Sequence, residues 1–105
     1  RTVATGTEDG PIYDDGILRI DLAQREVAVH GEAVTLSRKE FSLLALLARQ
    51  PGRLVTQAQI LREIWGPTHE EDTHYLRIVI ASLRKKLGAG IIETERGLGY
   101  RLGAA

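Results

Sequence analysis

Side chains able to bind a polyanion are concentrated near the C-terminus of the chain. Arg77, Arg84 and Lys85 fall within residues 73–87, and Arg96 stands in the glycine-containing turn Arg-Gly-Leu-Gly. A guanidinium group can bind phosphate or donate paired hydrogen bonds to guanine in the major groove. These residue types therefore predict contact with a nucleic acid, provided that the fold presents them together.

The distribution of charge supports this prediction although the formal net charge is zero. Residues 1–72 contain 8 Lys+Arg against 12 Asp+Glu, a net of −4, whereas residues 73–105 contain 6 Lys+Arg against 2 Asp+Glu, a net of +4. Such a charge asymmetry can orient the basic end toward phosphate. The neutral total predicts weak non-specific affinity.

Composition and motifs argue against several other classes of function. The 105 residues, 43% of them hydrophobic, suffice for one core, and no apolar run is long enough for a membrane span. There is no cysteine, and His69 and His74 lack a third ligand nearby, so we predict neither a metal nor a cofactor. Because no paired carboxylates or nucleophile–base arrangement is evident, we do not expect an enzyme.

The first part of the chain predicts an antiparallel sheet. Residues 1–11 have no periodicity, and we interpret them as a linker remnant that precedes a domain of residues 12–105. From Ile12 to Leu36 apolar residues alternate with polar ones, with breaks at Asp15-Gly16, residues 23–25 and His30-Gly31. This pattern predicts three or four short strands with one buried face.

From Ser37 onward the apolar period becomes helical. Ser37 with Glu40, and Thr56 with Gln59, each match a capping box, which predicts helices that end near Pro51-Gly52 and Gly66-Pro67. A third helix is expected from Asp72 or Thr73 to Gly88, followed by paired strands at 91–95 and 100–102. The order of sheet, three helices and hairpin predicts an α+β winged helix-turn-helix.

The third helix has the pattern required to read DNA. Leu76, Ile80, Leu83 and Leu87 form a stripe that can anchor it in the core. We expect Ala81 and Ser82 in the middle of the outer face, where small side chains permit close approach to base edges. Arg77 and Arg84 are candidates for guanine or phosphate, and His74 lies near the end that enters the groove first. Tyr75 could serve either the core or a phosphate.

Four segments together resemble the effector domain of OmpR/PhoB-type response regulators. They are Leu-Ser-Arg-Lys-Glu-Phe-Ser-Leu-Leu at 36–44, Leu-Arg-Glu-Ile-Trp-Gly at 61–66, Leu-Arg-Lys-Lys-Leu at 83–87 and Thr-Glu-Arg-Gly-Leu-Gly-Tyr-Arg at 94–101. The resemblance runs from about residue 12 to 102, and the last segment is its most specific part. Within the family, residues 73–78 resemble the KdpE branch, which regulates a potassium-uptake operon.

This resemblance implies a fold and a set of contacts. It implies four N-terminal strands, three helices and a C-terminal hairpin, or wing. It implies that the wing residues Thr94 and Arg96 meet the DNA backbone or minor groove. The outer positions of the third helix implied to face the major groove are His74, Tyr75, Arg77, Ile78, Ala81, Ser82, Arg84 and Lys85. The sequence departs from many relatives at Ser82, where they have arginine, which shifts the expected base reading toward His74 and Arg77.

The resemblance also implies partners. Similar proteins are bacterial and cytoplasmic, bind tandem direct repeats of double-stranded DNA as head-to-tail dimers, and have an N-terminal receiver domain phosphorylated by a sensor kinase. Their RNA polymerase contact is the loop before the third helix, which here comprises Pro67, Thr68, His69, Glu70, Glu71 and Asp72. The alternative is a winged-helix module for protein–protein contact with a receiver domain or polymerase, because fold does not dictate function.

Overall fold

The computed structural model describes residues 12–69 and 73–103. These residues belong to two compact units, of which the first ends at Thr35 and the second begins at Leu36.

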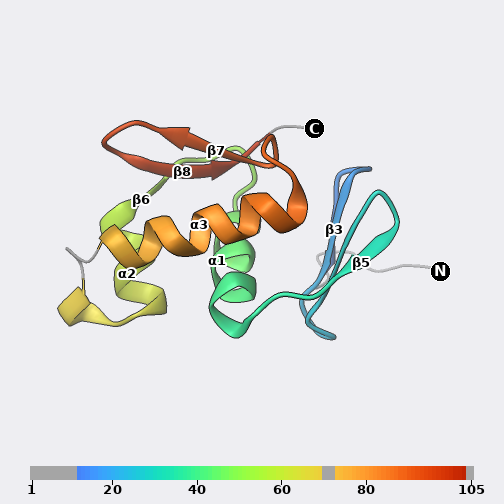
Figure 1. Cartoon of the computed structure of the whole chain (residues 1–105), viewed down its shortest axis with the longest axis horizontal. Helices are drawn as coiled ribbons and strands as arrows, with labels where there is room; N and C mark the ends of the chain where they lie inside the picture. The colour runs from blue at the N-terminus through green and yellow to red at the C-terminus, as the bar shows by residue number, and fades with distance from the viewer. Residues whose placement is uncertain (1–11, 70–72, 104–105) are drawn as a thin grey trace. The chain divides into compact units, whose positions relative to one another are not determined.

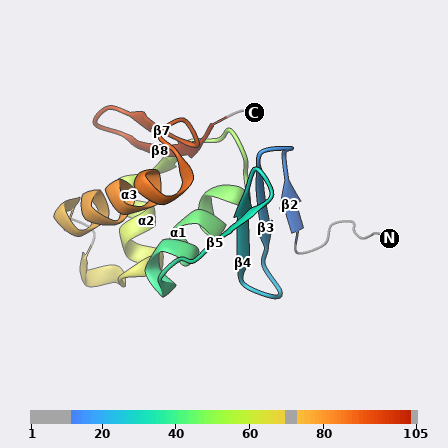
Figure 2. The same ribbon diagram turned by 45° about the vertical axis from the view of Figure 1, so that its right-hand side comes forward.

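The first unit is a four-stranded antiparallel sheet. Its strands are β2 (Ile12–Asp14), β3 (Leu18–Asp21), β4 (Glu26–Val29) and β5 (Glu32–Val34), and they pair in the order of the sequence (Figure 2). Leu18 and Ile20 are buried while Arg19 between them is exposed, as the period-two pattern predicts. His30 and Gly31 both have positive φ, which a two-residue type I′ hairpin turn requires.

The second unit contains the three predicted helices and the hairpin. The elements are α1 (Arg38–Ala48), β6 (Val55–Thr56), α2 (Gln57–Ile64), the short 3-10 helix η1 (Pro67–His69), α3 (Thr73–Leu87), β7 (Ile92–Glu95) and β8 (Gly99–Leu102). The three helices contact one another, and the hairpin of β7 and β8 lies beside α3 (Figure 1). The predicted α+β winged helix-turn-helix is confirmed.

The start of α1 confirms the first predicted capping box. Ser37 Oγ accepts a hydrogen bond from Glu40 N at 3.2 Å, and Glu40 Oε1 accepts one from Ser37 N at 2.8 Å. These bonds satisfy two amides that the helix itself leaves without partners. The following turns bury Leu43, Leu44 and Leu47.

The second predicted capping box was only half right. Thr56 Oγ1 accepts from Gln59 N at 3.1 Å, so Thr56 does cap α2. The Gln59 side chain does not return to the cap as predicted; its Nε2 donates to Glu63 Oε2 at 3.1 Å.

Strand β6 was not predicted from the sequence. It pairs antiparallel with β8, with Val55 opposite Tyr100 and Thr56 opposite Gly99, so that the hairpin becomes a three-stranded sheet in the order β6-β8-β7. In addition, Gln57 N donates to Leu98 O at 3.0 Å. The first turn of α2 is therefore bonded to the turn of the hairpin.

Candidate nucleic-acid interface

The inner face of α3 is fixed in the core of the second unit. Leu76, Ile80, Leu83 and Leu87 are all buried, as the sequence predicts. Leucine and isoleucine at this spacing bring one side of the helix onto α1 and α2, which both contact α3. The opposite side of α3 consequently has a fixed orientation within the unit.

The outermost row of α3 is less basic than the sequence predicts. At 3.6 residues per turn, the positions opposite the buried stripe are His74, Ile78, Ala81 and Lys85, and all four are exposed. The two central members are apolar, and Ile78 is 54% exposed. The charged side chains of the helix therefore stand at the end of this row or on its flanks.

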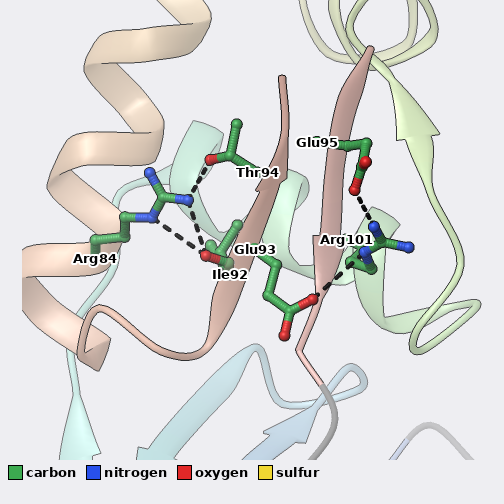
Figure 3. A network of polar contacts seen from close by, with 6 residues as sticks. All are labelled: Arg84, Ile92, Glu93, Thr94, Glu95 and Arg101. Carbon is green, nitrogen blue, oxygen red and sulfur yellow. Dashed lines mark hydrogen bonds and ion pairs between the residues drawn. The ribbon is translucent and has the colours of Figure 1, made fainter. Parts of the chain in front are cut away.

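One flank of α3 faces the hairpin. Arg77 and Arg84 are seven residues apart and share this side of the helix, but only Arg77 is exposed. Arg84 is half-buried, and its Nε and Nη2 donate to Ile92 O at 3.2 and 2.9 Å (Figure 3). Its Nη2 also donates to Thr94 Oγ1. The guanidinium predicted to contact DNA thus holds strand β7 in this structure.

The other flank of α3 is bonded to α1. The prediction that Ser82 stands in the middle of the outer face was wrong: Ser82 is half-buried, and its Oγ donates to Glu40 Oε2. Lys86 Nζ donates to Glu40 Oε1 at 2.7 Å. Ser82 lies on the flank of α3 that faces α1, where the buried carboxylate of Glu40 accepts its hydrogen bond. Tyr75, on the same flank, is 51% exposed.

Glu40 has a second structural role besides the helix cap that the sequence predicts. It is buried, with 6% of its surface exposed. Burial by itself would raise the pKa of its carboxyl group, but hydrogen bonds from Lys86, Ser82 and the Ser37 amide outweigh it and lower the pKa to about 2. Glu40 is therefore an anion that joins the start of α1 to the end of α3.

The turn of the hairpin presents an arginine and a leucine. Leu98 N donates to Glu95 O at 2.9 Å across the turn, where Gly97 has a φ of 75° that glycine adopts without strain. Arg96 and Leu98 are both exposed. Thr94 is exposed and, as described above, accepts a hydrogen bond from α3.

Arg101 does not add to the exposed positive charge. Its Nη2 pairs with Glu95 Oε1, and its Nε lies 3.4 Å from Glu93 Oε1, an ion-pair distance without hydrogen-bond geometry (Figure 3). Of the six cations in residues 73–105, Lys86 and Arg101 are thus in ion pairs and Arg84 is bonded to β7. Within the described part of the chain, Arg77, Lys85 and Arg96 are exposed and have no ion pair.

The predicted polymerase-contact loop is described only in part. Pro67–His69 form η1, in which Pro67 and Thr68 are exposed, while Glu70, Glu71 and Asp72 lie outside the described residues. Across residues 12–69 and 73–103, no group of three or more His, Cys, Asp or Glu side chains could hold a metal ion. Over the same ranges, no helix has the length and apolar character to cross a bilayer.

A helix anchored on one face, supported by two others and flanked by a β-hairpin defines the class of winged helix-turn-helix domains. A family model described as "Transcriptional regulatory protein, C terminal" matches residues 31–102. The chain belongs to this family, the OmpR/PhoB-type winged-helix DNA-binding domains, whose members are transcription regulators and not enzymes.

Among curated proteins, the chain is similar to the transcriptional regulatory protein KdpE of Mycobacterium tuberculosis H37Rv, with 37% identity over 109 residues that cover 99% of the chain and 48% of the relative. It is 39% identical over 100 residues to the KDP operon regulator KdpE of Escherichia coli K12, covering 90% of the chain and 44% of the relative. The chain spans about half the length of these relatives.

Two solved structures share the fold. The DNA-binding domain of RstA from Klebsiella pneumoniae, in complex with the RstA box, superposes with a TM-score of 0.79 at 31% identity, covering 88% of this chain and 96% of that one. The DNA-binding domain of CpxR from E. coli gives a TM-score of 0.80 at 29% identity, covering 91% and 99%.

Proposed function

We propose that this chain binds double-stranded DNA in a sequence-specific manner and so controls transcription as the output domain of a two-component response regulator. The observation that carries the proposal is the placement of α3. Its leucine stripe is buried, its opposite row is exposed, and exposed cations stand on the helix and on the hairpin turn beside it. A helix held in this way fits the major groove, while Arg96 reaches a backbone or a minor groove.

The contacts expected within this interface follow from the positions of the side chains. We propose that Lys85 and Arg96 bind phosphate and that His74 and Arg77 contact base edges or phosphate, with Tyr75 at the border of the groove. Ile78 and Ala81 lie at the centre of the exposed row. Ser82 and Arg84 are already bonded within the chain, so their contribution is to hold the helix and the wing in place.

The partners and the biological context are further parts of the proposal. We infer binding to tandem direct repeats as a head-to-tail dimer, contact of residues 67–72 with RNA polymerase, and function in the bacterial cytoplasm. Residues 12–105 would act as the output domain, joined through residues 1–11 to a receiver domain that a sensor kinase phosphorylates. Control of a potassium-transport operon is supported by the similarity to two KdpE proteins.

Selection of bound duplexes from a random pool, at a stated salt concentration, tests the proposal. We expect an enriched half-site, and repeated half-sites at one spacing if two copies bind head to tail. The affinity for the selected duplex should fall steeply as salt rises, because each cation that contacts phosphate releases a counterion. A pool without enrichment, together with affinity that salt does not change, would contradict DNA binding.

Comparison with a variant elsewhere on the surface locates the interface on the protein. The triple variant Arg77→Ala, Lys85→Ala, Arg96→Ala should lose affinity and reduce the slope of log K against log salt by about one for each side chain that contacts phosphate. The control is Arg53→Ala, which removes an exposed arginine outside α3 and the hairpin. If the triple variant bound like wild type while the chain bound a receiver domain or a polymerase subunit, the alternative protein–protein module would be favoured.

A further inference from the structure

The centre of the exposed row of α3 offers almost no hydrogen-bonding side chain. Ile78 and Ala81 occupy it, while the polar residues of the row, His74 and Lys85, stand at its two ends. Arg84 does not reach across the helix to compensate, because its guanidinium donates to Ile92 and Thr94. The groups in the middle of this surface are therefore methyl and methylene carbons.

The polar side chains on the opposite flank of α3 are also bonded within the chain. Ser82 and Lys86 donate to the buried carboxylate of Glu40, so neither hydroxyl nor ammonium turns toward the exposed row. The roll of the helix about its axis is consequently fixed by bonds on both sides, to β7 on one and to α1 on the other. Ile78 is held outward by this arrangement, with 54% of its surface exposed.

An apolar side chain that faces the base edges can pack against only one kind of apolar group in the major groove. Guanine, adenine and cytosine present donors and acceptors there, and thymine alone adds a carbon group, the methyl at C5. Burying a branched aliphatic side chain against this methyl removes both from water. Cytosine at the same position carries only hydrogen at C5, so Ile78 would lose this apolar contact.

A second copy of the chain is a less suitable partner for this surface. Arg77 stands on the flank next to Ile78 and Lys85 stands about two turns further along its row, and neither has an ion pair within the described residues. Two identical faces would bring like charges together, which is unfavourable. A polyanion satisfies the cations and the aliphatic group at the same time.

We propose, on the basis of the function proposed above, that Ile78 with Ala81 beside it reads the 5-methyl group of a pyrimidine and selects thymine over cytosine at the centre of the half-site. Ile78 is thus a specificity-determining residue, and Lys85 in the same row supplies affinity that is independent of the base.

Replacing single thymines of the selected half-site by deoxyuridine tests this inference, since the exchange removes only the methyl group. For wild-type protein we expect one or two positions at which the affinity falls about fourfold, the effect of losing one buried methyl at about 0.8 kcal/mol. In a second duplex, the thymine at this position is replaced by cytosine, which should also lower the affinity. Replacing that cytosine by 5-methylcytosine should recover part of the lost affinity.

Two variants assign the effect to Ile78. In Ile78→Ala the affinities for thymine and deoxyuridine duplexes should become equal. Leu98→Ala is the matched control, because Leu98 is an aliphatic side chain of similar exposure, 55%, on the hairpin turn, and its loss should leave the fourfold difference intact. Both residues are exposed, so neither exchange should alter folding.

The outcomes separate this inference from the proposed function. Salt-dependent, sequence-specific binding that no thymine-to-deoxyuridine exchange weakens would overturn the role of Ile78 and leave DNA binding intact. The same holds if Ile78→Ala keeps the full difference, or if it changes only the association of two protein copies. A chain that enriches no duplex at low salt would overturn both.

Discussion

Glu40 joins the start of α1 to the end of α3, and its removal should have a calculable effect on stability. The pKa of its carboxyl group is lowered from 4.5 to about 2, and a shift of one unit corresponds to about 1.4 kcal/mol. The full shift corresponds to about 3 kcal/mol. Because Lys86 is 38% exposed and partly screened by water, we expect Glu40→Gln to lower the free energy of unfolding by about 2–3 kcal/mol at pH 7.

The dependence on pH has a definite sign. The pKa of Glu40 is lower in the folded chain than in the unfolded chain, so folding releases its proton. The stabilisation is complete above the ordinary pKa of 4.5 and is lost as the pH falls from about 4.5 to about 2. The difference in stability between wild type and Glu40→Gln should therefore be constant from pH 7 to about pH 5 and shrink below it.

Urea denaturation of both proteins at intervals between pH 7 and pH 2.5 measures this difference. Glu32→Gln is the control, because Glu32 is an exposed glutamate on β5, and its removal should leave the acid dependence of wild type unchanged. Equal stability of wild type and Glu40→Gln at pH 7 would refute the reasoning. A difference that stays constant down to pH 2.5 would refute it too, since the carboxylate would then not be the source of the stabilisation.

Three other exchanges test the hairpin and the anchoring of α3. Arg84→Ala should speed amide hydrogen exchange in β7 and weaken DNA binding by a similar factor for every duplex, because the arginine holds the hairpin. A loss of affinity that depends on the identity of one base pair would indicate direct base reading instead. Gly99→Ala should destabilise the sheet by about 1–3 kcal/mol in urea denaturation, since a Cβ there would lie 2.0 Å from Val55 O, and unchanged stability would contradict that close approach. Leu83→Ala should lower the free energy of unfolding by about 2–5 kcal/mol in the same assay, as expected for a leucine fully buried in the core. A decrease below about 1 kcal/mol would mean that the stripe does not anchor the helix.

Local patterns were sufficient to predict most of the fold. The change from period two to a helical period at Ser37, the cap formed with Glu40 and the leucine stripe of α3 each predicted an element that is present. These signals are local, because they depend on residues within two turns of a helix or along one strand. Strand β6 was missed because two residues have no period and its partner lies more than forty residues away.

The candidate site was predicted less completely, for a physical reason. Spacing along a helix gives the direction in which a side chain leaves the axis, but not what it meets there. Ser82 and Arg84 both leave the helix at its flanks, and each finds a partner on another element, Glu40 and strand β7 respectively. A buried glutamate and a strand carbonyl at those places could not be inferred from the residues of α3 alone.

The bonds between the hairpin and the helices have a thermodynamic consequence. Arg84 connects α3 to β7, and the pairing of β6 with β8 connects the hairpin to the start of α2. The two segments that would touch a duplex are thus cross-linked before any ligand arrives, so little conformational freedom remains to be lost when they dock together. The entropy cost of ordering these two segments is therefore incurred during folding and not on binding. A duplex of a different DNA sequence cannot be accommodated by moving one segment without the other.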